Sequence, residues 1–312
     1  MELEFKAIFG CFLSVTTCFL LSVVYISSLY VWDAKYDRNH PSTIKKRFVS
    51  VFIMMFVSPV FLYASINKRI LERSSIWEIM GLKIHGLSEA FLIPWFLTMV
   101  LFLGPLFMQL VNGSLKSYLK PMYWVDSMQN LIWLRNHVVA PLSEEFTFRS
   151  CMLPLLLQSF SPSTAIFICP LFFGVAHFHH MIERIRKGLD FKTAFLASCF
   201  HFTYTTIFGM YSAFLLWRTG HFASTFIAHA FCNHMGVPDI QELLTYKELA
   251  LSLTPKKRPF SFIQIICSDG SISITAASCA ALTEQYLSIF YKGSKHQTID
   301  QLWSRKMISV EV

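Results

Sequence analysis

Seven long apolar stretches, separated by polar loops, constrain what this chain can fold into. At about 1.5 Å per helical residue, each is long enough to cross most or all of the roughly 30 Å hydrocarbon core of a bilayer. Only 15% of the residues are charged, against about a quarter in soluble proteins. The pattern predicts an all-α polytopic membrane bundle. The stretches are residues 7–32, 48–66, 90–111, 137–160, 164–180, 193–217 and 221–237.

We expect one transmembrane domain over residues 1–312, because no repeat or low-complexity segment divides the apolar stretches. Residues 260–282 would add an eighth span, but a polar segment interrupts them. The whole of 256–312 has the composition of an irregular C-terminal region. Within the third span, Pro94 and Pro105 should bend the helix, because proline disrupts the helical hydrogen-bond ladder.

The lysines and arginines of the loops predict an orientation. Basic residues follow the first, third, fifth and seventh spans, the fifth in a loop at 181–192, and cytosolic loops carry this excess. The N-terminus would then face the lumen, although the basic loop at 67–88 disagrees. This bias also explains the formal charge of +8, so nucleic acid is not an expected partner. The sequon Asn112-Gly-Ser114 would be cytosolic and therefore unmodified.

Charged residues lie inside the fourth apolar stretch, where they are costly unless they pair, face a wet cavity or take part in chemistry. Glu145 and Arg149 are four residues apart, so on a helix they share a face and can form an ion pair. Glu144 points about 100° away and has no such local partner. Glu144 is therefore the carboxylate that packing does not explain.

Two further residue pairs, each with a histidine, lie in apolar stretches at helical spacing. Phe173 and His177 are four residues apart, as are His229 and Asn233, so each pair shares a helix face. The predicted orientation brings both pairs and Glu144 into the cytosolic half of one bundle. His201 could reach the same depth and is a weaker candidate.

This combination suits hydrolysis. A carboxylate and an imidazole can hold and deprotonate a water molecule, and a second imidazole with an amide can donate to an oxyanion. The sequence has neither an HExxH zinc motif nor a GxSxG nucleophile motif, and its eight cysteines show no CxxC pair. We therefore expect no metal and no soluble cofactor. A zinc site made of His177, His180 and His229 is the alternative chemistry.

The three sets together resemble a known family. Glu144-Glu145-Phe-Thr-Phe-Arg149, Phe173-xxx-His177 and His229-xxx-Asn233 are similar, in order and spacing, to the motifs of CAAX prenyl endopeptidases of the Ras-converting type. These enzymes belong to the CPBP, or ABI-like, membrane glutamate proteases. The close resemblance covers a motif core at about 130–238, whereas the irregular region 256–312 departs from the clear final span usual in the family.

The resemblance implies an endoplasmic-reticulum membrane enzyme that removes the last three residues of isoprenylated proteins. Its substrates would be farnesylated or geranylgeranylated CAAX proteins such as Ras-like GTPases, with the prenyl chain in membrane lipid and the active site open to the cytosol. Glu144 and His177 would activate water. His229 and Asn233 would stabilise the oxyanion, and Glu145, Arg149 and Phe173 would support the site.

A non-catalytic role is the alternative function, because the wider family includes membrane scaffolds and processing partners. A scaffold can use a buried Glu145–Arg149 pair for structure alone. It has no need for the complete set of Glu144, His177, His229 and Asn233, and this completeness favours the enzyme.

Overall fold

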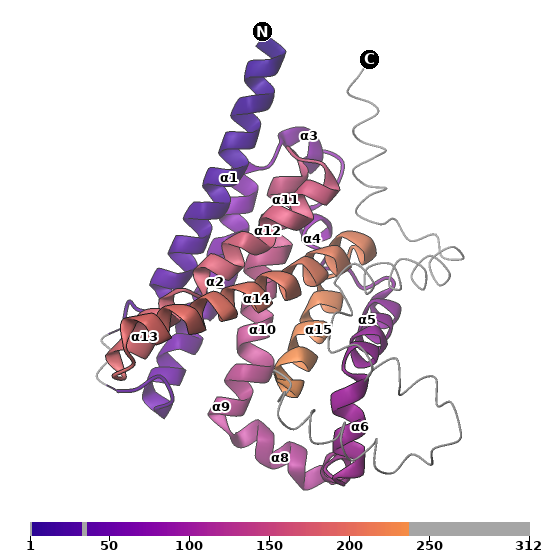
Figure 1. Cartoon of the computed structure of the whole chain (residues 1–312). Helices are drawn as coiled ribbons and strands as arrows, with labels where there is room; N and C mark the ends of the chain where they lie inside the picture. The colour runs from indigo at the N-terminus through magenta and orange to yellow at the C-terminus, as the bar shows by residue number, and fades with distance from the viewer. Residues whose placement is uncertain (1, 33–35, 237–312) are drawn as a thin grey trace, which may run out of the picture.

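The computed structural model describes residues 2–32 and 36–236, and within them every regular element is helical. This confirms the predicted all-α class. The expected eighth span at 260–282 and the irregular region 256–312 lie outside the described residues. Figure 1 shows the helices gathered around one central rod that contains α10 (Ala140–Glu145). The helices α1 (Glu2–Ser28) and α2 (Pro41–Ser65) lie on one side of it and α5 (Leu87–Leu101) on the other.

The N-terminal pair consists of α1 (Glu2–Ser28) and α2 (Pro41–Ser65), which pack against each other. α2 begins where Pro41 occupies the first turn, a position at which a missing N–H has no cost. Thr17 and Ser65 hydroxyls form a hydrogen bond of 3.0 Å between the two helices. Two one-turn helices follow, α3 (Lys68–Leu71) and α4 (Ile76–Ile79).

The third apolar stretch is broken into α5 (Leu87–Leu101) and α6 (Leu103–Val111), which meet at 74°. Of the two predicted proline bends, only the one near Pro105 coincides with a break between helices. Pro94 lies inside α5, whereas the break falls at Phe102, just before Pro105. Pro105 is in the first turn of α6, where backbone N–H groups have no helical partner in any case. The helices α7 (Leu115–Tyr118) and α8 (Pro121–Gln129) lead from there to the central rod.

The central rod is continuous from residue 131 to 157 but changes its winding. It runs through α9 (Leu131–Leu134), the π-helical η1 (Arg135–Val139), α10 (Ala140–Glu145), the π-helical η2 (Phe146–Cys151) and α11 (Met152–Leu157). Every residue from 145 to 157 is buried. The rod is therefore the core of the bundle, and π segments of this kind often occur at functional sites.

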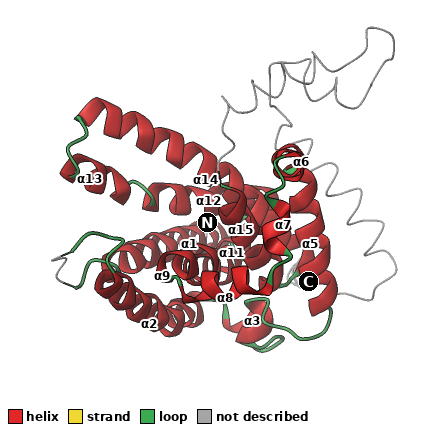
Figure 2. Ribbon diagram, turned by 90° about the horizontal axis from the view of Figure 1, so that it is seen from below, coloured by secondary structure: helices red, strands yellow, loops and turns green. Residues whose placement is uncertain are grey.

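The remaining helices enclose the rod. α12 (Pro162–Ala176) packs along α14 (Phe191–Thr219), with the short α13 (His179–Arg186) near their shared end (Figure 2), and α15 (Phe222–Met235) lies between α14 and α5. The predicted loop at 181–192 is thus helical over its first half. A Cβ at Gly174 would meet the side chains of Thr206 and Phe202, so glycine permits the close α12–α14 contact.

Three helical segments in the described residues are long and apolar enough to cross a membrane, and the bent α5–α6 pair would be a fourth. They are Ile8–Ser28, Pro41–Ser65 and Pro162–Arg186. The predicted number of seven or eight spans is therefore not confirmed. Changes in winding divide the central rod, and α15 has only 14 residues, so Glu144, His229 and Asn233 lie on elements that are not long uniform helices.

Candidate active site

The carboxylate and guanidinium of Glu145 and Arg149 form an ion pair in the core, with 3.2 Å between Oε1 and Nη1. Both side chains have no exposed surface, and they are four residues apart, as the sequence predicted. The guanidinium also lies 4.1 Å from the ring centroid of Phe173, a cation–π distance. Phe173 therefore belongs to the packing around this pair as well as to the motif of His177.

Gly209 of α14 makes room for the buried guanidinium. A Cβ at this position would lie 2.8 Å from Arg149 Nη2 and 2.7 Å from Pro170 Cβ, both shorter than ordinary contacts. The helix backbone therefore approaches Arg149 closely only because residue 209 has no side chain.

His229 links the ion pair to the second glutamate. Its Nδ1 lies 2.7 Å from Glu145 Oε1 and its Nε2 lies 3.7 Å from Glu144 Oε2. An ionised carboxylate can only accept, so the Nδ1–H of His229 donates to Glu145. Glu145 also accepts a hydrogen bond from the Ser212 hydroxyl of α14. The rod and the consecutive helices α14 and α15 thus meet at one buried carboxylate.

Glu144 is the more accessible of the two glutamates. Its side chain keeps 21% of its surface exposed, whereas that of Glu145 has none. The residue before it, Ser143, accepts or donates a 2.9 Å hydrogen bond with the Tyr25 hydroxyl, which fixes this turn of the rod against α1. Glu144 faces the imidazole of His229 on α15.

His177 caps the C-terminal end of α12. Its Nδ1 lies 2.7 Å from the carbonyl oxygen of Phe173, and because a carbonyl only accepts, Nδ1 carries a proton. In the neutral ring, Nε2 is then free to accept one. The ring contacts Phe173, 4.5 Å between centroids, and His201, at 4.8 Å. No hydrogen bond or ion pair joins His177 to Glu144 among the described residues; the ring of Phe173 touches both His177 and His229.

Asn233 is exposed on the last turns of α15. Its side-chain amide donates a 2.9 Å hydrogen bond to the backbone carbonyl of Asn136 in η1. The amide therefore connects α15 to the start of the rod, one turn beyond the histidine that meets the glutamates. A second amide N–H stays available to a ligand, because the NH₂ group carries two donors.

Four of the predicted residues, namely Glu144, Glu145, Arg149 and His229, thus form one contiguous cluster, and Phe173 packs on it. His177 is joined to this cluster through Phe173. The sequence reasoning did not identify Ser212 or Phe208, whose ring lies 4.8 Å from that of His229. Serine and phenylalanine are common in apolar helices, so neither carried a signal. His201, kept as a weaker candidate, does contact His177.

Within the described part of the chain, no group of three His, Cys, Asp or Glu side chains has the arrangement of a metal site. The alternative set of His177, His180 and His229 is accordingly not assembled there. The described cysteines are all unbridged.

The fold and the site together define a class: an all-helical membrane protein with a carboxylate–histidine centre enclosed by its helices. Residues 126–235, which contain this centre, match the family model described as type II CAAX prenyl endopeptidase Rce1-like. The chain belongs to this family of CAAX prenyl endopeptidases. Three curated relatives, all called CAAX prenyl protease 2, agree with the assignment.

The relative from Homo sapiens is 42% identical over 259 residues, covering 80% of this chain and 76% of the relative. The one from Arabidopsis thaliana is 34% identical and covers 72% and 80% of the two chains. The one from Saccharomyces cerevisiae is 30% identical and covers 70% and 78%. No solved structure matches the chain. The similarity therefore extends well beyond the motif core.

Proposed function

We propose that this protein hydrolyses the peptide bond after the prenylated cysteine of CAAX proteins and releases the C-terminal tripeptide. The observation that carries the proposal is the difference in surroundings between two adjacent glutamates. Glu145 is fully buried and bound by Arg149, Ser212 and His229, whereas Glu144 keeps exposed surface and faces an imidazole. A structural ion pair accounts for Glu145 but gives no reason for Glu144.

In the mechanism that we propose, Glu144 binds the attacking water and accepts one of its protons as the oxygen bonds to the scissile carbonyl carbon. His177 is the second acceptor, because its Nδ1–H is held by the Phe173 carbonyl and its Nε2 has a free lone pair. When the tetrahedral intermediate collapses, the C–N bond breaks and the proton passes to the leaving amine. Water thus supplies the hydroxyl of the new carboxylate and the proton of the tripeptide.

His229 and Asn233 are the proposed donors to the oxyanion. The Nδ1–H of His229 is already committed to Glu145, so donation from Nε2 requires the imidazolium form. The carboxylates of Glu145 and Glu144 lie 2.7 and 3.7 Å from the two ring nitrogens of His229. The second N–H of Asn233 would complete the pair of donors.

The substrates that we propose are farnesylated or geranylgeranylated CAAX proteins such as Ras-like GTPases. Their prenyl chains would stay in membrane lipid while the peptide reaches Glu144 between helices. The proposed location is the endoplasmic-reticulum membrane, with the site open to the cytosol, as the basic loops suggest. The alternative is a non-catalytic scaffold, for which the buried Glu145–Arg149 pair would suffice without Glu144.

Membranes from cells that express this chain, in a background without endogenous CAAX protease activity, test the function. We expect a farnesylated CAAX peptide to lose its last three residues, detected by mass spectrometry, and the same peptide without the prenyl group to survive. Equal cleavage of both peptides would contradict the substrate class. No cleavage of either, with the protein present at normal abundance, would favour the scaffold.

A further inference from the structure

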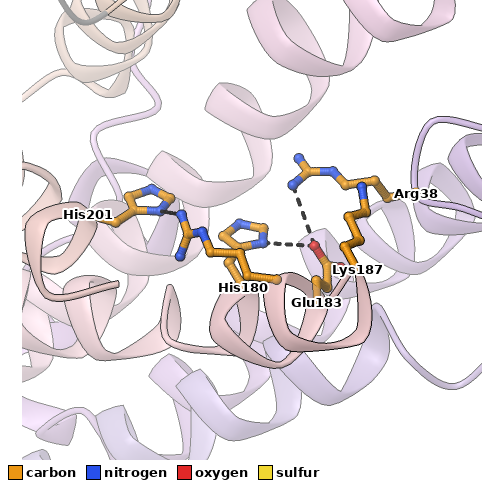
Figure 3. A pocket seen from close by; sticks show the side chains of 6 residues that line it. Arg38, His180, Glu183, Lys187 and His201 are labelled. Carbon is orange, nitrogen blue, oxygen red and sulfur yellow. Dashed lines mark hydrogen bonds and ion pairs between the residues drawn. The ribbon is translucent and has the colours of Figure 1, made fainter. Parts of the chain in front are cut away.

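A second polar site lies beside the proposed catalytic histidine. A cavity of about 160 Å³ opens between α13, the first half of α14 and the segment before α2, and Figure 3 shows the side chains around it. The residues that line it are Arg38, His180, Glu183, Arg184, Lys187 and His201. The proposed chemistry uses none of them directly, and the positive charges outnumber the single carboxylate.

Two of the three cations in this cavity already have a carboxylate partner. Glu183 is the shared acceptor for Arg38 at 3.5 Å and for His180 at 3.1 Å (Figure 3), and Arg47 joins from outside the cavity at 3.3 Å. Lys187 lies 3.3 Å from Asp37. The negative charges around the cavity are therefore committed to these partners.

Arg184 differs because both of its side-chain partners are neutral. Nη1 donates to the Ser198 hydroxyl at 2.8 Å, and Nη2 lies 3.3 Å from His201 Nδ1. No ion pair to Arg184 occurs in the described segments, and the side chain is half-buried. A guanidinium has five N–H donors in a planar fork that suits a carboxylate, so Arg184 retains donors for an anion.

The cavity is within reach of the proposed scissile bond. Arg184 contacts His201, and the ring of His201 lies 4.8 Å from that of His177. One imidazole thus separates the guanidinium from the proposed proton acceptor. Three extended residues span at most about 10 Å, so a bound tripeptide can extend past one imidazole ring.

We propose that Arg184 binds the C-terminal carboxylate of the substrate, and so sets the cleavage point three residues from the chain end. This inference rests on the proposed function. The anion is a free α-carboxylate on an extended tripeptide, with its last side chain in the cavity. His201 positions Arg184 by accepting its Nη2–H, so the pocket and the hydrolytic centre share one side of α14.

The test compares two farnesylated CAAX peptides, one with a free C-terminal carboxylate and one with a C-terminal amide. Binding is measured on purified protein in nanodiscs with non-cleavable analogues, and kcat/KM with cleavable ones. Charge-assisted hydrogen bonds predict that the wild type prefers the acid by about tenfold to a hundredfold. Arg184→Gln should lose most of this preference, because only binding of the peptide with a free carboxylate is weakened. Arg184→Lys should retain part of the preference.

Arg186→Gln is the matched control, because Arg186 is exposed on the same helix and does not line the cavity. It should keep the full preference. Equal binding of acid and amide by the wild type would overturn the proposal even if Arg184→Gln does not fold. If Arg184→Gln changes only the dependence of binding on anionic lipid in the nanodisc, the site binds a lipid headgroup. That result would also overturn the proposal.

The binding arm separates this inference from the proposed function. Acid preference that Arg184→Gln abolishes, in a protein without tripeptide release, would support the pocket and contradict the hydrolase. Tripeptide release without acid preference would support the hydrolase and contradict the pocket.

Discussion

His229 donates its Nδ1 proton to Glu145 across 2.7 Å, although the two residues are 84 positions apart in the chain. This contact changes the role that the sequence suggested for Glu145. The carboxylate does more than neutralise Arg149, because it also orients the imidazole that faces Glu144. A buried carboxylate that fixes a histidine by its Nδ1–H is a recurrent device in hydrolytic sites.

Glu145→Ala should therefore reduce both abundance and activity per molecule. Removing one partner of a buried ion pair costs about 3–5 kcal/mol in soluble proteins, and here it also releases His229. The double change Glu145→Ala with Arg149→Ala should recover part of the abundance but none of the turnover. Quantitative immunoblotting with normalised kinetics measures both effects. Equal abundance of the single and double variants would contradict the ion pair's contribution.

Asn233→Ala and His229→Ala test the proposed oxyanion site. Loss of one donor typically costs about 2.7–4 kcal/mol in the transition state, or roughly 10²–10³ in kcat. We expect kcat to fall by this factor for Asn233→Ala with little change in KM, and at least as much for His229→Ala. The double variant should lose less than the product of the single losses, because both donors serve one oxygen.

The hydrogen bond from Asn233 to the Asn136 carbonyl offers a competing structural role. Under that role, Asn233→Ala would lose a hydrogen bond worth about 1 kcal/mol and would be less abundant. Its kcat per folded molecule would be normal. Kinetics normalised to folded protein distinguish the two roles.

Gly209 lies outside the sequence motifs, but Gly209→Ala should still destabilise the protein around the site. The added methyl would fall 2.8 Å from Arg149 Nη2 and 2.7 Å from Pro170, so the guanidinium or α12 must move. Overpacking of this kind costs about 1–3 kcal/mol. Thermal melting in detergent should show a lower Tm than wild type. Gly104→Ala is the matched control, because a methyl there meets nothing within 4 Å.

Much of this organisation followed from the sequence, but the parts that depend on long-range packing did not. The apolar stretches gave the helical class, and the i, i+4 spacing gave the Glu145–Arg149 pair. No local sequence pattern predicts the contact of His229 with both glutamates, because helix packing alone brings α15 to the rod. The π-helical winding of η2 was also invisible, since its residues read as an ordinary apolar helix.

The predicted orientation remains a prediction, and the sequon at Asn112 tests it. Asn112 directly follows α6, in a connection that the basic-loop rule assigns to the cytosol, where glycosyl transfer does not occur. Endoglycosidase treatment should leave the electrophoretic mobility of the protein unchanged. A shift that disappears in Asn112→Gln would reverse the orientation and move the proposed site to the lumen.

The most direct measurement is the rate of tripeptide release by purified protein that carries Glu144→Gln. Glutamine keeps the shape of the side chain but cannot accept the water proton, and general-base catalysis contributes about 10²–10⁴-fold. We predict that release from a farnesylated CAAX peptide falls at least a hundredfold in Glu144→Gln, and comparably in His177→Ala, while folding and peptide binding persist. Activity above a tenth of wild type in folded Glu144→Gln protein would contradict the role of Glu144 as the base that activates water.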